Sequence, residues 1–253
     1  MKSKRCKLIV VRDKLTARGL KGKGVMAYAP GNPMMDAIQK SKCPVSIDGY
    51  RRVILLCGSR WPEAMDNFKR QVKAIELINS KDNIVILTAL GSEPKIDIIE
   101  SYLSSLGYKK GSLFKDETFA QSSFSKDNHI FLIGSGNFSK WASWAEVGIS
   151  NAGTATEQLV GLGVPALSLP GKGPQFKGTF AKRQSRLLGG SVLPCRSPAI
   201  LANRIKFLLQ EKSLITELGK IGVRRMGRHG GSASIAKLIS ELVLNDAKNQ
   251  LEE

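Results

Sequence analysis

The feature that most constrains this chain is a repeated alternation between short apolar runs and longer amphipathic stretches. The apolar runs are rich in Val, Ile and Leu and begin near residues 52, 83, 129, 147, 165 and 191. Stretches with helical spacing separate them, at about 62–78, 94–106, 138–146, 154–162 and 175–188, and a helical tail covers about 198–244. This alternation predicts an α/β fold in which a parallel sheet is covered by helices on both faces.

The first fifty residues have a different pattern. Two short apolar runs, at 8–13 and 25–29, predict strands that are too few to form a sheet of their own. The segment GNPMMDAI, residues 31–38, then predicts the start of a helix with Asn32 as its cap. We therefore expect residues 1–50 to be a remnant of a preceding domain plus a linker, and residues 51–253 to form the main domain.

Ligands of parallel α/β sheets bind beyond the carboxyl ends of the strands, so the turns that follow the predicted strands are candidate site segments. The first of these is Gly58-Ser59-Arg60, between a strand and a helix. Glycine lets a phosphate approach the backbone, and the serine hydroxyl can donate a hydrogen bond to it. The arginine guanidinium can form bidentate hydrogen bonds with two phosphate oxygens. Strand-to-helix turns with Gly and Ser are common, so this motif alone has low specificity.

The second candidate turn is AGTATEQ, at residues 152–158. Gly153, Thr154 and Ala155 would present backbone N–H groups at the start of a helix, where anions are favoured. Glu157 would then accept the hydroxyls of a ribose. The alternative is purely structural: Thr154 caps the helix and Glu157, three residues later, reaches back to form a capping box.

Further turns have weaker signals. The segment GKGPQFKGTFAKRQSRLLG, residues 171–189, places Gln175 and Gln184 where they would contact a sugar or a phosphate, with Phe176, Phe180 and Leu187 as the buried stripe of its helix. The segment IGSGNF, residues 133–138, ends another strand with small residues, and Ser232 would cap a later helix. Several such strand ends on one edge together suggest a nucleotide-diphosphate ligand.

The formal charge of +18 indicates a polyanionic partner, either nucleic acid, an acidic lipid surface or a phosphorylated substrate. A solvated basic face is an equally good explanation. The chain has no zinc-finger spacing, RNP-type motif or aromatic residues interleaved with basic ones, which makes specific nucleic-acid binding a poor fit. The four cysteines form no CxxC pair and the chain has two histidines, so we expect no metal site, and Cys57 is expected to be a buried apolar residue.

No apolar run approaches the roughly 20 residues of a membrane-spanning helix. The apolar core near the N-terminus, residues 8–11, is also shorter than that of a secretory signal. We therefore expect a cytoplasmic protein, with its basic residues allowing peripheral contact with the cytoplasmic face of the membrane.

Taken together, GSR after a strand, AGTATEQLVGLGVPALSLP, and GPQF followed by FAKRQSRLLG resemble the C-terminal, donor-binding half of GT-B glycosyltransferases. The resemblance is strongest to lipid-A-disaccharide synthase and its cyanobacterial relatives, and it covers roughly residues 25–240. It implies a Rossmann-like domain that binds a UDP-sugar, with no further cofactor and no metal, and that transfers a hexosyl group such as N-acetylglucosaminyl to a lipid-linked or other acceptor.

The resemblance also implies roles for individual residues. Gly58, Ser59 and Arg60 would contact the diphosphate, and Gly153, Thr154 and Ala155 would line the phosphate and sugar. Glu157 would hold the ribose, while Gln175 and Gln184 would reach the sugar or phosphate. No catalytic base is assigned, because the family places it in an N-terminal domain that is largely missing here.

Three explanations for that missing domain remain open. The chain is truncated or its start is misassigned, a separate chain supplies the acceptor domain, or the protein is a noncatalytic nucleotide-binding remnant or interaction module. A further alternative is a basic protein that binds nucleic acid without specificity.

Overall fold

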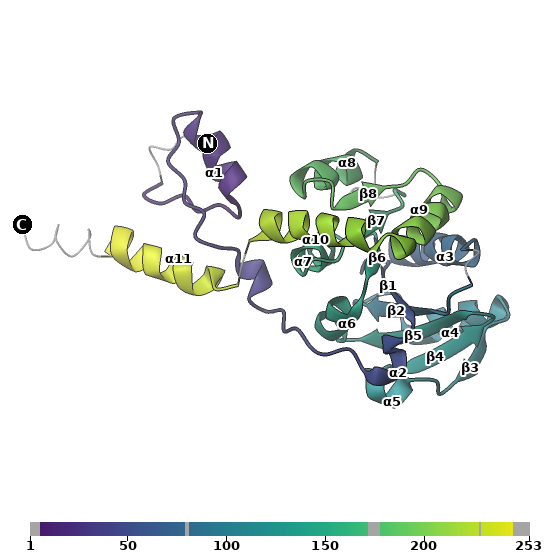
Figure 1. Ribbon diagram of the computed structural model, residues 1–253. Helices are drawn as coiled ribbons and strands as arrows, with labels where there is room; N and C mark the ends of the chain where they lie inside the picture. Colours follow the sequence, from purple (N-terminus) through teal and green to yellow (C-terminus); the bar gives the residue numbers. More distant parts are fainter. Residues whose placement is uncertain (1–5, 79–80, 172–177, 228, 245–253) are drawn as a thin grey trace, which may run out of the picture. The chain divides into compact units, whose positions relative to one another are not determined.

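The computed structural model describes residues 6–78, 81–171, 178–227 and 229–244 (Figure 1). The chain forms two compact units, one spanning Gln39–Gly222 and a smaller one that combines Met1–Ile38 with Val223–Glu253. The expected division into residues 1–50 and 51–253 stays a prediction.

Within the part of the chain that the structure describes, the larger unit is built on a sheet with the strand order β3-β4-β5-β2-β1-β6-β7-β8 (Figure 1). The six strands from β5 to β8 in this order are parallel, as the sequence predicts. They are β1 (Arg51–Leu56), β2 (Ile84–Leu90), β5 (His129–Ser135), β6 (Val147–Ser150), β7 (Ala166–Ser168) and β8 (Val192–Pro194).

The other edge of the sheet is antiparallel and was not expected from the sequence. It consists of β3 (Lys109–Gly111), which pairs with β4 (Ser122–Lys126), and β4 pairs in turn with β5. Neither strand has the unbroken apolar run that marks the central strands: β3 is exposed and β4 is rich in serine. Backbone hydrogen bonding of β4 to β5 and of β3 to β4, rather than an apolar pattern of their own, therefore accounts for their extended conformation.

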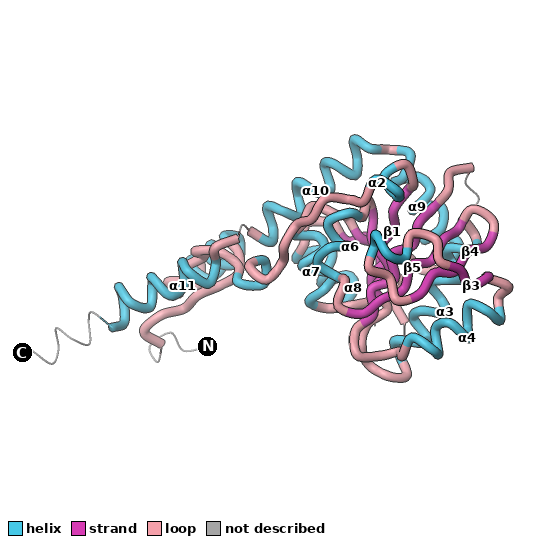
Figure 2. Tube along the Cα trace, turned by 90° about the horizontal axis from the view of Figure 1, so that it is seen from below, coloured by secondary structure: helices cyan, strands magenta, loops and turns pink. Residues whose placement is uncertain are grey.

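The central strands are buried on both faces, which is why they are continuously apolar; all seven residues of β2 are buried. Val53 and Leu55 of β1 join the cluster formed with three helices, α3 (Glu63–Glu76), α4 (Ile96–Ser105) and α9 (Pro198–Gln210). The intervening Ile54 lies on the opposite face, where α6 (Phe138–Trp144) and α7 (Thr154–Gly161) pack. Figure 2 shows helices on both sides of the sheet. The α/β, Rossmann-like fold is confirmed.

The predicted helices are present with ends shifted by a few residues, and the helical tail is divided. Its parts are α9, α10 (Lys212–Met226), α11 (Gly231–Ile239) and a π-helical turn at Ser240–Leu244. The remaining helices are α1 (Lys14–Lys21), η2 (Pro33–Met35), α2 (Val45–Asp48), α5 (Lys115–Thr118) and α8 (Gly178–Leu187).

The two strands predicted within the first thirty residues are wrong. The structure has a single bridge, Val10 with Tyr28, and the chain between them forms α1. The Asp13 side chain caps this helix by accepting a hydrogen bond of 2.8 Å from the Thr16 N–H. This cap turns the chain into a helix directly after the first apolar run, and so that run has no long partner strand.

Side chains of the predicted helix entry at residues 31–38 form hydrogen bonds that join the N-terminal and C-terminal segments of the smaller unit. Asn32 caps η2 through the Met34 N–H, as predicted, and also donates to the Met226 carbonyl at 3.0 Å. Asp36 accepts from the N–H groups of Gly230 and Ser232, both at 2.7 Å. The prediction that Ser232 caps the last helix is wrong, because Gly230 is the N-cap residue and the distant Asp36 carboxylate satisfies the first N–H groups.

Removal of the Asp36 carboxylate should loosen the start of α11. The Ser232 hydroxyl and N–H, together with the Gly230 and Gly231 N–H groups, lower the pKa of Asp36 from 3.8 to about 2. Its stabilising effect is therefore complete above the ordinary pKa and is lost as the pH falls toward 2. Hydrogen exchange of the α11 amides should be faster in Asp36→Ala than in the wild type at pH 5, and should change less on acidification.

A matched control is Asp97→Ala, which removes an exposed carboxylate from the first turn of α4. It should leave α11 exchange unchanged. Equal α11 exchange in wild type and Asp36→Ala at pH 5 would contradict the capping role.

Candidate functional site

The parallel strands all end at one edge of the sheet, and this edge brings the predicted turns together. In the register of β1 and β6, Leu56 is paired with Ser150, so the two strands end side by side. The Asn151 N–H continues this pairing with a hydrogen bond of 2.8 Å to the Leu56 carbonyl. The predicted segments at 58–60 and 153–155 therefore leave neighbouring strands at the same edge.

The turn after β1 is open to solvent. Gly58 has a φ of +101°, a conformation that favours glycine, and Ser59 and Arg60 are exposed. The Arg60 carbonyl accepts from the Ala64 N–H at 2.8 Å at the start of α3. The turn after β2 packs against it, since a Cβ on Gly91 would lie 2.8 Å from the Ser59 Cβ. Two backbone turns thus support each other and leave the Arg60 side chain exposed.

The turn after β6 leads into α7, whose N-cap is Gly153 with no side-chain cap. Thr154 is exposed and is the first helical residue, so the capping-box interpretation, which needs Thr154 as the cap, is wrong. Ala155 follows it in the first turn and is half-buried, as is Glu157. The buried Thr156 holds the turn from below, with its hydroxyl hydrogen-bonded to the Ala152 carbonyl and to Ser150 Oγ.

Gln184 contacts the same turn from α8. Its side chain is 5% exposed, and Nε2 lies 3.4 Å from the carbonyls of both Ala152 and Gly153. The predicted buried stripe of α8 is wrong: Phe180 is half-buried and Leu187 is exposed, whereas Ala181 and Gln184 are buried. The small Ala181 lets the helix come close to the turn, and the Gln184 amide donates hydrogen bonds to the turn's carbonyl groups. Phe or Leu at these positions would leave those carbonyl groups without hydrogen-bond partners. Gln175 lies outside the described residues.

The turn after β5, at residues 135–137, is held by neighbours at the antiparallel edge. Gln121 Oε1 accepts from the Ser135 N–H, and Asn137 Nδ2 donates to the Phe119 carbonyl, both at 2.7 Å. In the strand order, β2 lies between β5 and β1, so this turn is separated by one strand from the turn at 58–60 and by two from the turn at 153–155.

Buried side-chain amides form hydrogen bonds that hold the site turns in place, and no sequence motif predicted them. Asn151 Nδ2 donates to the Leu169 carbonyl at 2.8 Å, and its Oδ1 accepts from Gln71 Nε2 at 3.0 Å. Asn67 Nδ2 donates to the Cys57 carbonyl at 3.1 Å. The network joins the ends of β1, β6 and β7 to α3. The one feature of the sequence that could have indicated this network is Asn151, a polar residue placed directly after an apolar run.

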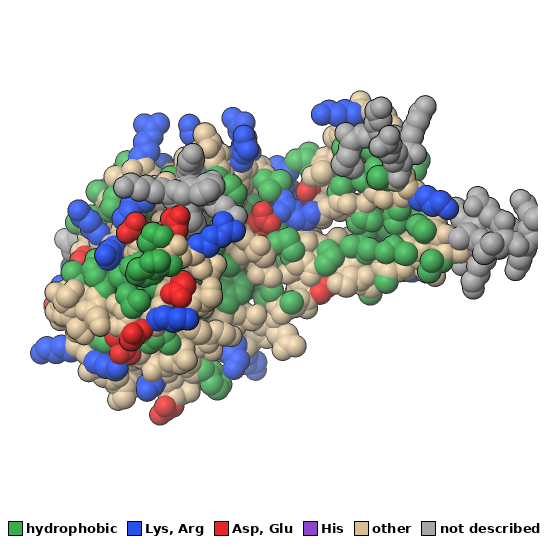
Figure 3. Space-filling model, turned by 180° about the vertical axis from the view of Figure 1, so that it is seen from behind, with side chains coloured by type: hydrophobic (Ala, Val, Ile, Leu, Met, Phe, Trp, Pro, Cys, Tyr) green, Lys and Arg blue, Asp and Glu red, His purple; other side chains and the backbone are tan. Residues whose placement is uncertain are grey.

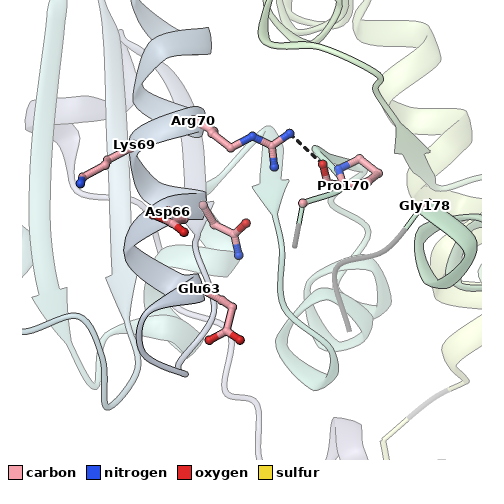
Figure 4. Close-up of a pocket in the computed structure, with 8 residues that line it drawn as sticks. Glu63, Asp66, Lys69, Arg70, Pro170 and Gly178 are labelled. Atoms are coloured by element: carbon pink, nitrogen blue, oxygen red, sulfur yellow. Dashed lines mark hydrogen bonds between the residues drawn. The ribbon is translucent and has the colours of Figure 1, made fainter. Parts of the chain in front are cut away.

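Arg70 of α3 holds the end of β7 and borders a cavity. Its guanidinium donates to the Leu169 carbonyl at 3.3 Å. It also donates to the Pro170 carbonyl at 2.7 Å (Figure 4). The cavity beside it has a volume of about 590 Å³ and is lined by Glu63, Asp66, Lys69 and Gly178 among others. Because carboxylates and cations share this wall, the cavity has no strong preference for an anion.

Cys57 comes directly after β1, at the start of the first site turn. Burial raises the pKa of Cys57 to about 12, so this thiol is a buried, unreactive group next to the first turn, as its sequence context predicts. No group of three or more potential metal ligands occurs in the described segments. None of the helices described has the length and apolarity that crossing a bilayer requires.

Comparison with known proteins identifies the fold by structure alone. No family model matches the chain, and no curated protein matches it by sequence. A protein from Listeria monocytogenes assigned as a UDP-N-acetylglucosamine 2-epimerase superposes with a TM-score of 0.65 at 16% identity, covering 94% of this chain and 60% of that one. S. aureus MnaA in a structure with UDP gives 0.59 at 14% identity, covering 94% and 61%.

A third structure is a separate domain. The C-terminal CMP-Kdo binding domain of WaaA from Acinetobacter baumannii has a TM-score of 0.51 at 13% identity, covering 72% of this chain and 92% of that domain. The first two proteins have the GT-B fold, and the likeness shows that this chain has a Rossmann-like α/β fold of the kind found in GT-B proteins. The chain spans about three fifths of the length of the first two structures.

Replacing Asn151 by Ala should destabilise the larger unit. The substitution removes two buried hydrogen bonds, one to the Leu169 carbonyl and one from the Gln71 amide, and each contributes about 0.5–1.5 kcal/mol. Urea denaturation should show a lower free energy of unfolding. Asn203→Ala, on the exposed face of α9, is the control and should change it by under about 0.5 kcal/mol. Equal stability of Asn151→Ala and wild type would mean that the network is not required.

Proposed function

We propose that this chain binds a UDP-sugar and acts as the donor-binding half of a glycosyltransferase. One observation carries the proposal: a glycine turn with an exposed arginine and a helix N-terminus without a side-chain cap leave neighbouring strands at the same edge of the sheet. A diphosphate needs backbone N–H groups and a cation close together, and this edge has both.

Each residue then has a stated task. The N–H groups of Thr154 and Ala155 bind the diphosphate at the start of α7, and the Arg60 guanidinium binds it from the turn after β1. Gly58 keeps the backbone accessible, and Ser59 donates its hydroxyl. Glu157 accepts the ribose hydroxyls. Gln184 sets the position of the turn through the Ala152 and Gly153 carbonyls.

The proposed reaction is transfer of the sugar, in which UDP leaves with its diphosphate. A helix N-terminus and Arg60 stabilise the negative charge that develops on the leaving UDP, and this chemistry needs no metal. The GSR and AGTATEQ motifs resemble lipid-A-disaccharide synthase, which supports a hexosyl group as the donated sugar and a lipid-linked acceptor. Such a reaction places the protein at the cytoplasmic face of a membrane, together with a domain that binds the acceptor.

Calorimetric titration with UDP, UDP-N-acetylglucosamine and GDP tests the donor site. We expect saturable UDP binding, weakened in Glu157→Ala by about 1–3 kcal/mol because the ribose hydroxyls lose their acceptor. The control variant Glu211→Ala removes an exposed carboxylate after α9 and should bind like wild type. Unchanged UDP binding by Glu157→Ala would contradict the ribose role. RNA binding that falls steeply with salt, without UDP binding, would favour the nucleic-acid alternative.

A second titration separates phosphate contacts from base contacts. Arg60→Ala should weaken UDP more than uridine, because only UDP carries the diphosphate. Arg224→Ala, an exposed arginine of α10, serves as the charge-matched control and should affect neither. Equal losses for UDP and uridine in Arg60→Ala would exclude a phosphate contact.

A further inference from the structure

One stretch of the chain is basic to an unusual degree. Residues 158–210 contain eight Lys and Arg and no Asp or Glu. The structure describes six of these eight cations, which lie on α8, after β8 and on α9.

Four of the six cations line one groove. Lys182 and Arg186 come from α8, Arg196 follows β8, and Arg204 lies on α9, around a space of about 850 Å³. No carboxylate is among the described residues that line it. Figure 3 shows Lys and Arg side chains projecting from the upper edge of the larger unit, the edge where Figure 1 draws α8 and β8. The groove therefore concentrates positive charge without internal neutralisation.

The groove is distinct from the proposed donor site, although α8 borders both. With about 100° between successive helical residues, Gln184 points roughly opposite to Lys182 and Arg186. Gln184 faces inward, where it contacts the carbonyls of Ala152 and Gly153. The two cations are exposed on the outer face of the same helix. Their removal should therefore leave the turn at 152–155 in place.

Large apolar side chains flank the cations. Ile200 is 39% exposed and lines the groove, and Phe207 is 54% exposed two turns further along α9. Together with Arg204 they form a stripe at helical spacing on the outer face of α9, opposite the buried Ala202, Ile205 and Leu209. Leu187, 39% exposed, stands beside Arg186 on α8. Exposed apolar groups set among cations are typical of surfaces that enter the headgroup region of a bilayer.

We propose that this groove and its apolar rim dock the protein on a bilayer that contains anionic phospholipid. Lys182, Arg186 and Arg196 bind headgroup phosphates, and Ile200, Phe207 and Leu187 enter the interface between headgroups and acyl chains. Arg204 is held in place by donating to the Pro194 carbonyl at 3.0 Å, so its guanidinium is already fixed at the groove wall. A nucleic acid would leave the aliphatic rim residues without a partner. The inference deepens the proposed function, since it gives the face on which a lipid-linked acceptor would be met.

Cosedimentation of the full chain with vesicles tests this directly. The vesicles contain phosphatidylcholine alone or with about one third phosphatidylglycerol, near physiological salt. Binding should require phosphatidylglycerol and fall by about tenfold or more in the triple variant Lys182→Ala, Arg186→Ala, Arg196→Ala. The charge-matched control Lys14→Ala, Lys21→Ala, Lys23→Ala removes three exposed lysines of the N-terminal segment and should bind nearly as well as wild type. Phe207→Ser should also weaken binding, which a purely ionic contact would not predict.

Several outcomes would overturn the proposal: no binding to the anionic vesicles, equal losses in the two triple variants, or binding of RNA but not vesicles. Displacement from the vesicles by millimolar glycerol phosphate would show that a soluble phosphate ester is the ligand instead. UDP titration of the groove triple variant keeps the two claims separate. Normal UDP binding with no vesicle binding rejects only the docking surface, and vesicle binding without UDP binding rejects only the donor site.

Discussion

The amide network of Asn151, Gln71 and Asn67 is the interaction on which the candidate site depends. A parallel sheet ends in carbonyl groups that have no further ladder partner, and here those of Cys57 and Leu169 accept hydrogen bonds from side-chain amides inside the protein. An unpaired buried carbonyl is unfavourable by about 1–3 kcal/mol, so the network favours one arrangement of the strand ends. Because the strand ends are fixed, the first residues of the turns that follow them are fixed too. The backbone groups of these turns stay available to a ligand.

Helix α8 connects the two surfaces that we propose. Its inner face has Ala181 and Gln184, which let it approach the turn before α7, and its outer face has Lys182 and Arg186. One helix therefore positions the donor turn and contributes to the basic groove. A protein that takes a water-soluble donor and a membrane-bound acceptor needs both surfaces close together, and a shared helix is a direct way to place them.

The parallel part of the fold was predictable because buried strands such as β2 are continuously apolar, and this pattern depends on no other segment. The antiparallel edge was not, since β4 forms only through pairing with β5, and β3 only through pairing with β4. The same reason explains the errors at Ser232 and on α8. In each case a distant partner decides the outcome: the Asp36 carboxylate for α11, and the Ala152 and Gly153 carbonyls for Gln184. For the site, the sequence identified the turns at 58–60 and 153–157, but strand order alone reveals that they are neighbours.

The most direct test of the central claim is an amide NMR spectrum of the full chain, recorded as UDP is added. If the edge between β1 and β6 is the donor site, the amides of residues 58–60 and 153–157 should shift together, with one dissociation constant. The amides near Arg196 and Arg204 should stay in place. Shifts confined to the α8–α9 groove, or spread evenly over the basic surface, would contradict the account.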